Sequence, residues 1–368
     1  MTISSLESIL DLAVEIQQIP APTFSEGARA GFVEARFRRE GLDDVWRDGL
    51  GNVLARLAGG GGGKPLILAA HLDTVFPMET ELTVHRTPEQ VYGPGIGDNS
   101  LGLAGLFGLV WEIRARSLAL APDLILTATV GEEGLGNSRG MQAVVDRYAD
   151  QALAYVAVEG MALGHIFNRG MGVRRYKVTY RTKGGHSWVD FGVPSAVHEI
   201  SRLVSRLSSL QIPESPRTSW NAGLIQGGTS VNVIAAEASV QLDLRSEDQA
   251  ALSSLEAEVT QAARSVPPPG VEVEVELIGQ RPMGSIPDDH PFVCLAQDSL
   301  RSVGIEPHLS IGSTDASIPL HRGLPAVCIG LTTGSGTHSL DEYIDVAPLG
   351  DGMEQLLSLV AGAHGALA

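Results

Sequence analysis

The stretch PLILAAHLD, residues 65–73, joins a short and almost wholly apolar run to a histidine and an aspartate at its carboxyl end. Three further apolar runs are typical of buried strands, and they lie at 124–130, 153–158 and 325–331. Helical patterns separate the runs, at about 100–116, 138–149 and 291–304. Apolar strands that alternate with helices predict an α/β fold with a mainly parallel sheet, covered by helices on both faces.

A different pattern occupies residues 170–282. Polar and apolar residues alternate over 173–181, as in a strand with one exposed face. The order of predicted elements is strand, helix, strand, strand, helix, strand: 173–181, 194–210, 220–226, 237–245, 248–265 and 271–278. This is the split βαβ, or ferredoxin-like, arrangement. We therefore expect one domain from residues 1–169 and 283–368, and a second domain, 170–282, inserted into it.

Composition excludes several classes of partner. The chain has 26 basic and 43 acidic residues, and its net charge of −17 disfavours nucleic acid and anionic membranes. The N-terminal residues predict no signal peptide, and no run of about 18 apolar residues predicts a membrane span. Two cysteines, Cys294 and Cys328, are too few for a disulfide scaffold and fit a reducing compartment. We expect a cytoplasmic protein.

Polar residues gather where the predicted strands end. In open parallel sheets, ligands bind outside the carboxyl ends of the strands. Seven histidines and carboxylates follow such ends or lie in a glycine-rich loop that precedes a helix: His71, Asp73, Asp98, Glu132, Glu133, Glu159 and His338. We expect them to meet at one edge of the sheet.

Carboxylates that lie this close repel one another unless a positive charge sits among them. No lysine or arginine is interleaved at these strand ends, so a divalent cation is the simplest compensation. Mixed imidazole and carboxylate ligands suit zinc, and also cobalt or manganese. Seven candidates are enough for two metal ions about 3.5–4 Å apart that share one carboxylate.

The motifs HLDTV (71–75), GDN (97–99) and EE (132–133), together with Glu159 and His338, resemble those of the co-catalytic zinc exopeptidases and deacylases. That family includes bacterial glutamate carboxypeptidase, acetylornithine deacetylase, succinyl-diaminopimelate desuccinylase, aminoacylase and peptidase T. The resemblance covers essentially the whole chain. It implies a catalytic metal-binding domain of zinc-exopeptidase type and makes 170–282 a lid or dimerisation domain.

The resemblance also implies a division of the ligands between two metal ions. One ion would be held by His71, Asp98 and Glu159, and the other by Asp98, Glu133 and His338. In the family the shared aspartate precedes a cis peptide bond.

Two further residues of the set receive roles without a metal bond. By the same resemblance, Asp73 would orient His71 and fix its tautomer. Glu132 would be the general base, which takes a proton from the water that bridges the metals and returns it to the leaving amine.

The inserted segment carries three more candidates by resemblance. His186, in KGGHS (183–187), matches a histidine that reaches the active site of a neighbouring subunit, which implies a homodimer through 170–282. There it would donate to the developing oxyanion. Asn232 matches a substrate-binding asparagine, and Arg245 matches an arginine that grips a substrate carboxylate. A guanidinium suits that task because it can pair with both carboxylate oxygens.

The expected activity is metal-dependent hydrolysis of an amide bond in a small peptide or N-acyl amino acid with a free carboxylate. Glu159, rather than an aspartate, favours the carboxypeptidase and deacylase branch of the family. The alternative is a di- or tripeptidase of peptidase T type. Two remote alternatives are a metal-binding protein without catalysis and a serine hydrolase, since Gly136–Gly140 matches the G-x-S-x-G pattern around Ser138.

Overall fold

The computed structural model describes residues 3–265 and 268–367 and divides the chain into two compact units. Unit 1 consists of Met1–Gly170 and Gly284–Ala368, and unit 2 is Met171–Met283. These boundaries lie one residue from those expected for the insertion. No helix in the described ranges is both long and apolar enough to cross a membrane.

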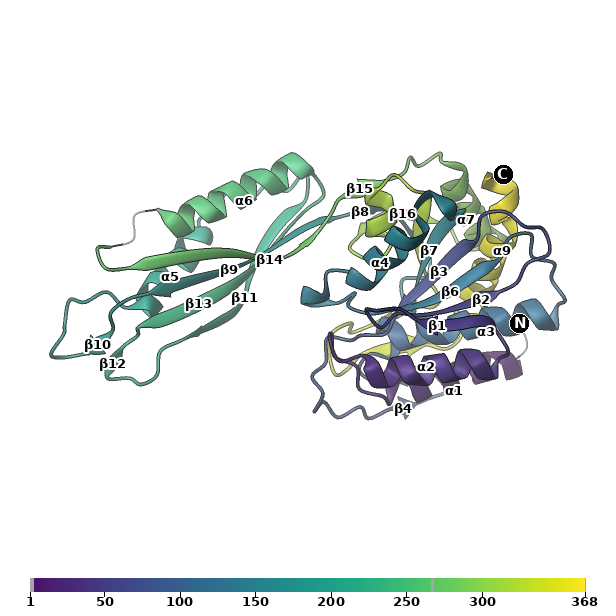
Figure 1. Ribbon diagram of the computed structural model, residues 1–368, viewed down its shortest axis with the longest axis horizontal. Coiled ribbons are helices and arrows are strands. Elements are labelled where there is room, and N and C mark those ends of the chain that lie inside the picture. Colours follow the sequence, from purple (N-terminus) through teal and green to yellow (C-terminus); the bar gives the residue numbers. More distant parts are fainter. Residues whose placement is uncertain (1–2, 266–267, 368) are drawn as a thin grey trace. The chain divides into compact units, whose positions relative to one another are not determined.

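Unit 1 is built on a sheet with nine strands among the described residues (Figure 1). Its order is β1-β2-β6-β3-β7-β17-β8-β15, and β16 pairs with β8. The strands are β1 (Asp43–Arg47), β2 (Val53–Leu57), β3 (Leu66–His71), β6 (Leu124–Thr129), β7 (Ala154–Glu159), β8 (His165–Gly170), β15 (Gly284–Ser285), β16 (His308–Gly312) and β17 (Ala326–Gly330). The central strands β6, β3, β7 and β17 are parallel and almost wholly buried, which confirms the mainly parallel sheet.

Helices cover this sheet on both faces. They are α1 (Ile3–Gln17), α2 (Gly27–Arg39), α3 (Gly102–Ala115), α4 (Arg139–Tyr148), α7 (Pro291–Ser302), α8 (Ser317–His321) and α9 (Leu349–Leu367). The chain passes from β3 through α3 to β6, and then back past β3 through α4 to β7. Crossovers between parallel strands are almost always right-handed, so two that run in opposite directions should place their helices on opposite faces. Figure 1 shows α3 and α4 on opposite faces of the sheet.

Unit 2 has a four-stranded antiparallel sheet in the order β11-β13-β9-β14. Its elements are β9 (Gly172–Arg181), α5 (Ala196–Leu207), β11 (Thr218–Gly227), β13 (Glu237–Ser246), α6 (Gln249–Arg264) and β14 (Glu272–Arg281). Buried and more exposed residues alternate along β13, and its buried side chains pack with those of α5 and α6 in a separate core. The element order and pairing are those of the split βαβ arrangement.

Several short elements were not predicted from the sequence. A second sheet of unit 1 joins β18 (Gly334–Ser335), β19 (Tyr343–Asp345), β5 (Gln90–Tyr92) and β4 (His85–Arg86). In unit 2, β10 (Gly185–His186) pairs with β12 (Val233–Ile234). Strands of two or three residues are too short to show a period-2 pattern, so only the pairing defines them.

Candidate metal centre

The seven predicted residues of unit 1 lie around the carboxyl ends of its central strands. His71 is the last residue of β3, and Glu159 is the last residue of β7. Glu132 and Glu133 follow β6, which pairs with β3 in parallel. Adjacent parallel strands end at the same edge of the sheet, so the topology brings these side chains together.

The Asp98 carboxylate lies between two imidazoles. Its Oδ1 is 2.9 Å from Nε2 of His71, and its Oδ2 is 3.2 Å from Nε2 of His338. Each oxygen thus faces a different histidine. A carboxylate in this position can supply one oxygen to each of two metal ions.

Two further carboxylates flank the histidines. Oε1 of Glu133 is 3.1 Å from Nε2 of His338, and Oε2 of Glu159 is 3.6 Å from Nε2 of His71. Ligand atoms of His71, Asp98 and Glu133 lie within 4.8 Å of one another. The structure therefore contains a candidate metal site. These three residues come from both of the sets that the resemblance implied, so the division of ligands between two ions stays a prediction.

Charge is unbalanced in this cluster. Hydrogen bonds with Asp98 and Glu133 raise the pKa of His338 to about 10. Burial raises the pKa of Glu159 to about 7, although nearby His71 opposes the shift. Burial also disfavours ionised Asp98, but its hydrogen bonds with His338 and His71 prevail and hold its pKa well below the usual range. The donor set of imidazoles and carboxylates suits a divalent cation, which would supply the missing positive charge.

The cluster is closed on one side and open on the other. The His71 side chain is 2% exposed, whereas the His338 side chain is 52% exposed. A metal ion held here would be accessible to water or substrate from the open side, as a catalytic zinc site requires.

Asp73 lies behind the cluster and is fully buried. Its Oδ1 accepts a hydrogen bond from the backbone amide of Glu132, and its Oδ2 accepts from the amide of Glu133, both at 2.9 Å. Thr23 also donates to Oδ2 at 2.9 Å. Burial opposes ionisation of Asp73, but the nearby His71 imidazole and these amides lower its pKa overall.

The contact between Asp73 and His71 differs in detail from the expectation. Nδ1 of His71 is 2.9 Å from the backbone oxygen of Asp73 but 3.7 Å from its carboxylate. The backbone oxygen is thus the closer partner, because the carboxylate already serves three donors. A proton on Nδ1 that is shared with this oxygen leaves Nε2 as the lone-pair nitrogen, which faces Asp98.

The loop that carries Asp98 is held by Asn99, which belongs to the GDN motif but received no role from the sequence, and by Glu342, which sequence reasoning missed. The peptide bond from Asp98 to Asn99 is cis, as in the family that the chain resembles. Asn99 is buried, donates to the backbone oxygen of Val158 at 2.9 Å and accepts from the amide of Gly160 at 3.0 Å. Glu342 accepts from three backbone amides of the same loop. No sequence motif signals either contact, since each joins segments distant along the chain.

The predicted residues His186, Asn232 and Arg245 belong to unit 2. Nδ1 of His186 accepts from the backbone amides of Trp188 at 3.2 Å and Val189 at 3.3 Å. This arrangement requires a lone pair on Nδ1, so Nε2 is the nitrogen that is protonated and can donate.

The other two residues have local partners. Oδ1 of Asn232 accepts from the Ser230 hydroxyl at 2.8 Å. Nε of Arg245 donates to Asp243 at 2.6 Å, so its guanidinium takes part in an ion pair while its side chain is 42% exposed.

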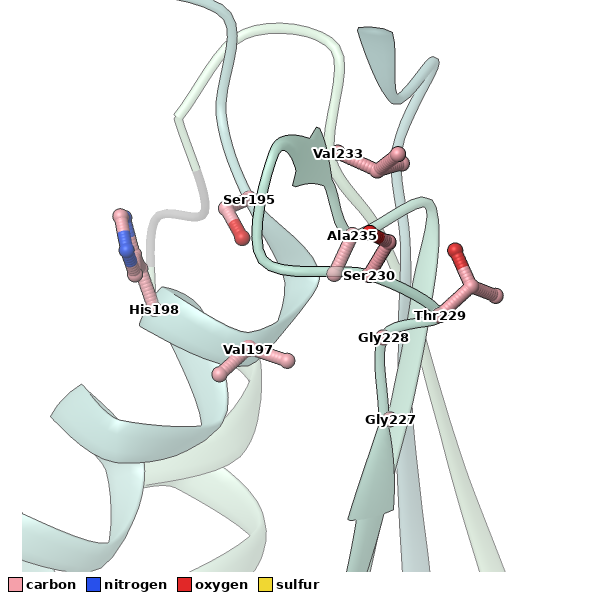
Figure 2. Close-up of a pocket in the computed structure, with 9 residues that line it drawn as sticks. All are labelled: Ser195, Val197, His198, Gly227, Gly228, Thr229, Ser230, Val233 and Ala235. Carbon is pink, nitrogen blue, oxygen red and sulfur yellow. The ribbon is translucent and has the colours of Figure 1, made fainter. Parts of the chain in front are cut away.

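A hollow of about 410 Å³ lies in unit 2 beside the segment that carries Asn232. Figure 2 shows it between the start of α5, with Ser195 and Val197, and the segment with Gly228, Ser230 and Val233. The segment around Asn232 therefore borders open space within this unit.

Ser138 does not have the surroundings of a nucleophile. It is fully buried, and its hydroxyl has no hydrogen-bond partner among the described residues. A catalytic serine needs a base within hydrogen-bond reach. The geometry gives no support to the serine hydrolase alternative.

Comparison with known proteins gives matches over most of the chain. A family model described as peptidase family M20/M25/M40 matches residues 67–362. Carboxypeptidase G2 of Pseudomonas sp. (strain RS-16) is 25% identical over 347 residues, which cover 88% of this chain and 80% of that protein. Succinyl-diaminopimelate desuccinylase of Methylorubrum extorquens is 23% identical over 371 residues, covering 93% and 95%.

The fold is shared with solved structures. A tripeptidase from Staphylococcus aureus superposes with a TM-score of 0.80 at 24% identity, covering 97% of this chain and 98% of that one. At this level of identity the likeness establishes the fold, and the chemistry rests on the side chains described above.

Proposed function

Because the chain belongs to peptidase family M20/M25/M40 and is a hydrolytic enzyme, we propose that it cleaves an amide bond next to a free carboxylate. The substrate would be a small peptide or an N-acyl amino acid. The observation that carries this proposal is the Asp98 carboxylate, whose two oxygens face His71 and His338 at 2.9 and 3.2 Å.

Two divalent ions, most simply zinc, would be held by these residues together with Glu133 and Glu159. Imidazole and carboxylate ligands support zinc, and cobalt or manganese are the alternatives. When bound, the ions would supply Lewis acidity toward the scissile carbonyl and the attacking water.

Glu132 would be the residue that moves protons. It is 5% exposed, follows the end of β6 and precedes the ligand candidate Glu133. The Asp73 carboxylate holds the backbone amides of both glutamates, so their side chains start from a fixed backbone. Glu132 would take a proton from the attacking water and deliver it to the departing amine.

Unit 2 would supply the residues that recognise the substrate. Arg245 would pair with the substrate carboxylate. Asn232 would also bind substrate; it lies on the segment between Ser230 and Val233, two residues that line the hollow. The names of two relatives, carboxypeptidase G2 and succinyl-diaminopimelate desuccinylase, favour this carboxylate-directed activity. The tripeptidase favours the alternative, a di- or tripeptidase that recognises a free amine.

We further propose that unit 2 joins two copies of the chain and that His186 acts in the partner's site. Two observations support this. β11 is an edge strand with mostly exposed residues, and a sheet edge is a ready surface for pairing. Trp188 and Phe191, on the loop after His186, are 86% and 91% exposed, which is unusual for large apolar side chains without a partner.

The free thiols of Cys294 and Cys328 support a cytoplasmic location.

Matched pairs of substrates test the proposed activity. Metal-loaded protein is assayed with N-acetyl and N-succinyl amino acids, dipeptides and tripeptides, and with the carboxamide of each. We expect cleavage of N-blocked compounds with a free carboxylate and a strong loss of rate on amidation. Cleavage only of compounds with a free amine, whether amidated or not, would favour the di- or tripeptidase. No hydrolysis of any compound would contradict both.

A further inference from the structure

The Glu342 carboxylate is fully buried against the loop that carries Asp98. Its Oε1 accepts from the backbone amides of Gly97 at 2.7 Å and Asp98 at 2.9 Å. Its Oε2 accepts from the amide of Gly95 at 3.0 Å. Three donors from four consecutive residues thus converge on one side chain.

The loop needs glycine to make this convergence possible. Gly95 has a φ of 76°, in the left-handed region that a residue with a Cβ seldom adopts. A Cβ at Gly97 would lie 2.7 Å from the Met161 side chain. Glycine at these two positions therefore lets the loop follow the backbone path in which its amides reach the Glu342 carboxylate.

Glu342 also connects this loop to the other histidine of the cluster. It lies four residues after His338, and its backbone oxygen accepts from the amide of Gly93 at 2.9 Å. The residues that follow it form β19, which pairs with β5 immediately before the loop. One residue thus links the segment of His338 to the segment of Asp98.

A buried carboxylate at position 342 is energetically unfavourable. Burying an ionised group without a cation is unfavourable, and no lysine or arginine forms an ion pair with Glu342 within the described part of the chain. Asp98 lies next to it and adds repulsion. A glutamine could not replace it, because one of its two terminal atoms donates and would face an amide that also donates.

We propose that Glu342 is a positioning residue: it holds the backbone of Asp98 so that the Asp98 oxygens face His71 and His338 and can bind two metal ions together. This inference rests on the proposed metal-dependent function and adds a residue that neither the sequence motifs nor the ligand sets contain. Residues behind metal ligands typically change metal affinity about 10–100-fold when they are replaced.

Co²⁺ binding tests this role without measuring catalysis. Metal-free full-length protein is titrated with Co²⁺, and binding is followed by visible absorption and by competition with a chelator. Glu342→Gln should bind Co²⁺ about 10–100-fold more weakly and show an altered absorption band. The matched control is Glu112→Gln, which changes another buried carboxylate of unit 1; Glu112 lies on α3 and pairs with Arg116. It should bind Co²⁺ like the parent.

Thermal melting of the metal-free proteins separates positioning from general destabilisation. Glu342→Gln should melt within a few degrees of Glu112→Gln. Co²⁺ affinity within twofold of the parent, or a loss that Glu112→Gln shares, would overturn the proposal. If Glu342→Gln does not fold, Glu342→Asp, which keeps the charge but shortens the side chain, is judged by the same limits.

These outcomes are distinct from failure of the proposed function. A chain that hydrolyses no amide but loses Co²⁺ affinity in Glu342→Gln would keep the positioning role and lose the hydrolase proposal. A chain that hydrolyses amides but binds Co²⁺ equally well in both forms would lose only the role of Glu342.

Discussion

The two units hold their candidate functional residues in opposite ways. In unit 1, His71, Asp73 and Glu133 are buried, and the Asp73 carboxylate ties the backbone of Glu132 and Glu133 to the segment that carries His71. In unit 2, the His186 and Asn232 side chains are exposed, and the hydrogen bonds that they accept come from neighbours on their own segments. The groups of unit 1 are already held in fixed positions, so a small displacement should reduce activity. The exposed groups of unit 2 would act only once a substrate or a second copy of the chain covers them.

Metal removal should reduce hydrolysis more than any single substitution, because it takes both ions from the buried site of unit 1. Dialysis against a chelator is expected to abolish hydrolysis, and added Zn²⁺ or Co²⁺ should restore it. Mg²⁺, which prefers oxygen ligands, is the control and should restore little. Undiminished turnover by protein shown to be metal-free would contradict the account.

Glu132→Gln should give the next largest loss of activity. Loss of a general base costs about 10²–10⁴-fold in kcat, while metal content should stay at the parental level because Glu132 is assigned no metal bond. Glu112→Gln again serves as the control for a buried carboxylate. A kcat within threefold of the parent would remove Glu132 from the chemistry.

His186→Ala tests the role of the exposed residues of unit 2. An oxyanion donor is worth about 10²–10³-fold in kcat, so this variant should be nearly inactive. Mixed with Glu132→Gln and allowed to exchange subunits, it should recover activity, since one site of the heterodimer then has both residues. No recovery after confirmed exchange would place His186 in its own subunit's site or outside catalysis. A fully active monomer by sedimentation would remove the dimer.

Arg245→Lys should give the smallest of these effects. Lysine keeps the charge but loses the planar fork, so KM for carboxylate substrates should rise about 10–100-fold with little change in kcat. Arg181→Lys, on the same sheet and paired with Glu237 and Glu274, is the control and should leave KM unchanged. An equal KM for parent and Arg245→Lys would argue that Arg245 serves only its ion pair with Asp243.

The sequence predicted the features that depend on local patterns. The apolar runs at β3, β6 and β7 identified the parallel strands, and the rule that ligands bind at strand ends placed His71, Glu133 and Glu159 at one edge. Strand β8 was missed because its sequence, HIFNRG, mixes polar and apolar residues without a clear period.

The supporting contacts could not be predicted in the same way. Asn99 and Glu342 act through bonds to backbone groups 59 to 247 residues away along the chain. The GDN motif contains Asn99 but does not reveal its contacts, and no motif contains Glu342. Glu342 follows Asp341, so the pair looks like an ordinary solvated acidic surface in the sequence. Only the pairing of β5 with β19 brings the two loops together and buries the carboxylate.

The central claim is that one carboxylate, Asp98, is shared by two metal ions. Metal content measured by mass spectrometry on protein saturated with Zn²⁺ and freed of excess tests it most directly, with parent, Asp98→Ala and His186→Ala compared side by side. The account predicts about two ions per chain for the parent and for His186→Ala, and loss of both for Asp98→Ala, because both ligand sets use that residue. An Asp98→Ala protein that is folded and still holds two ions would contradict it.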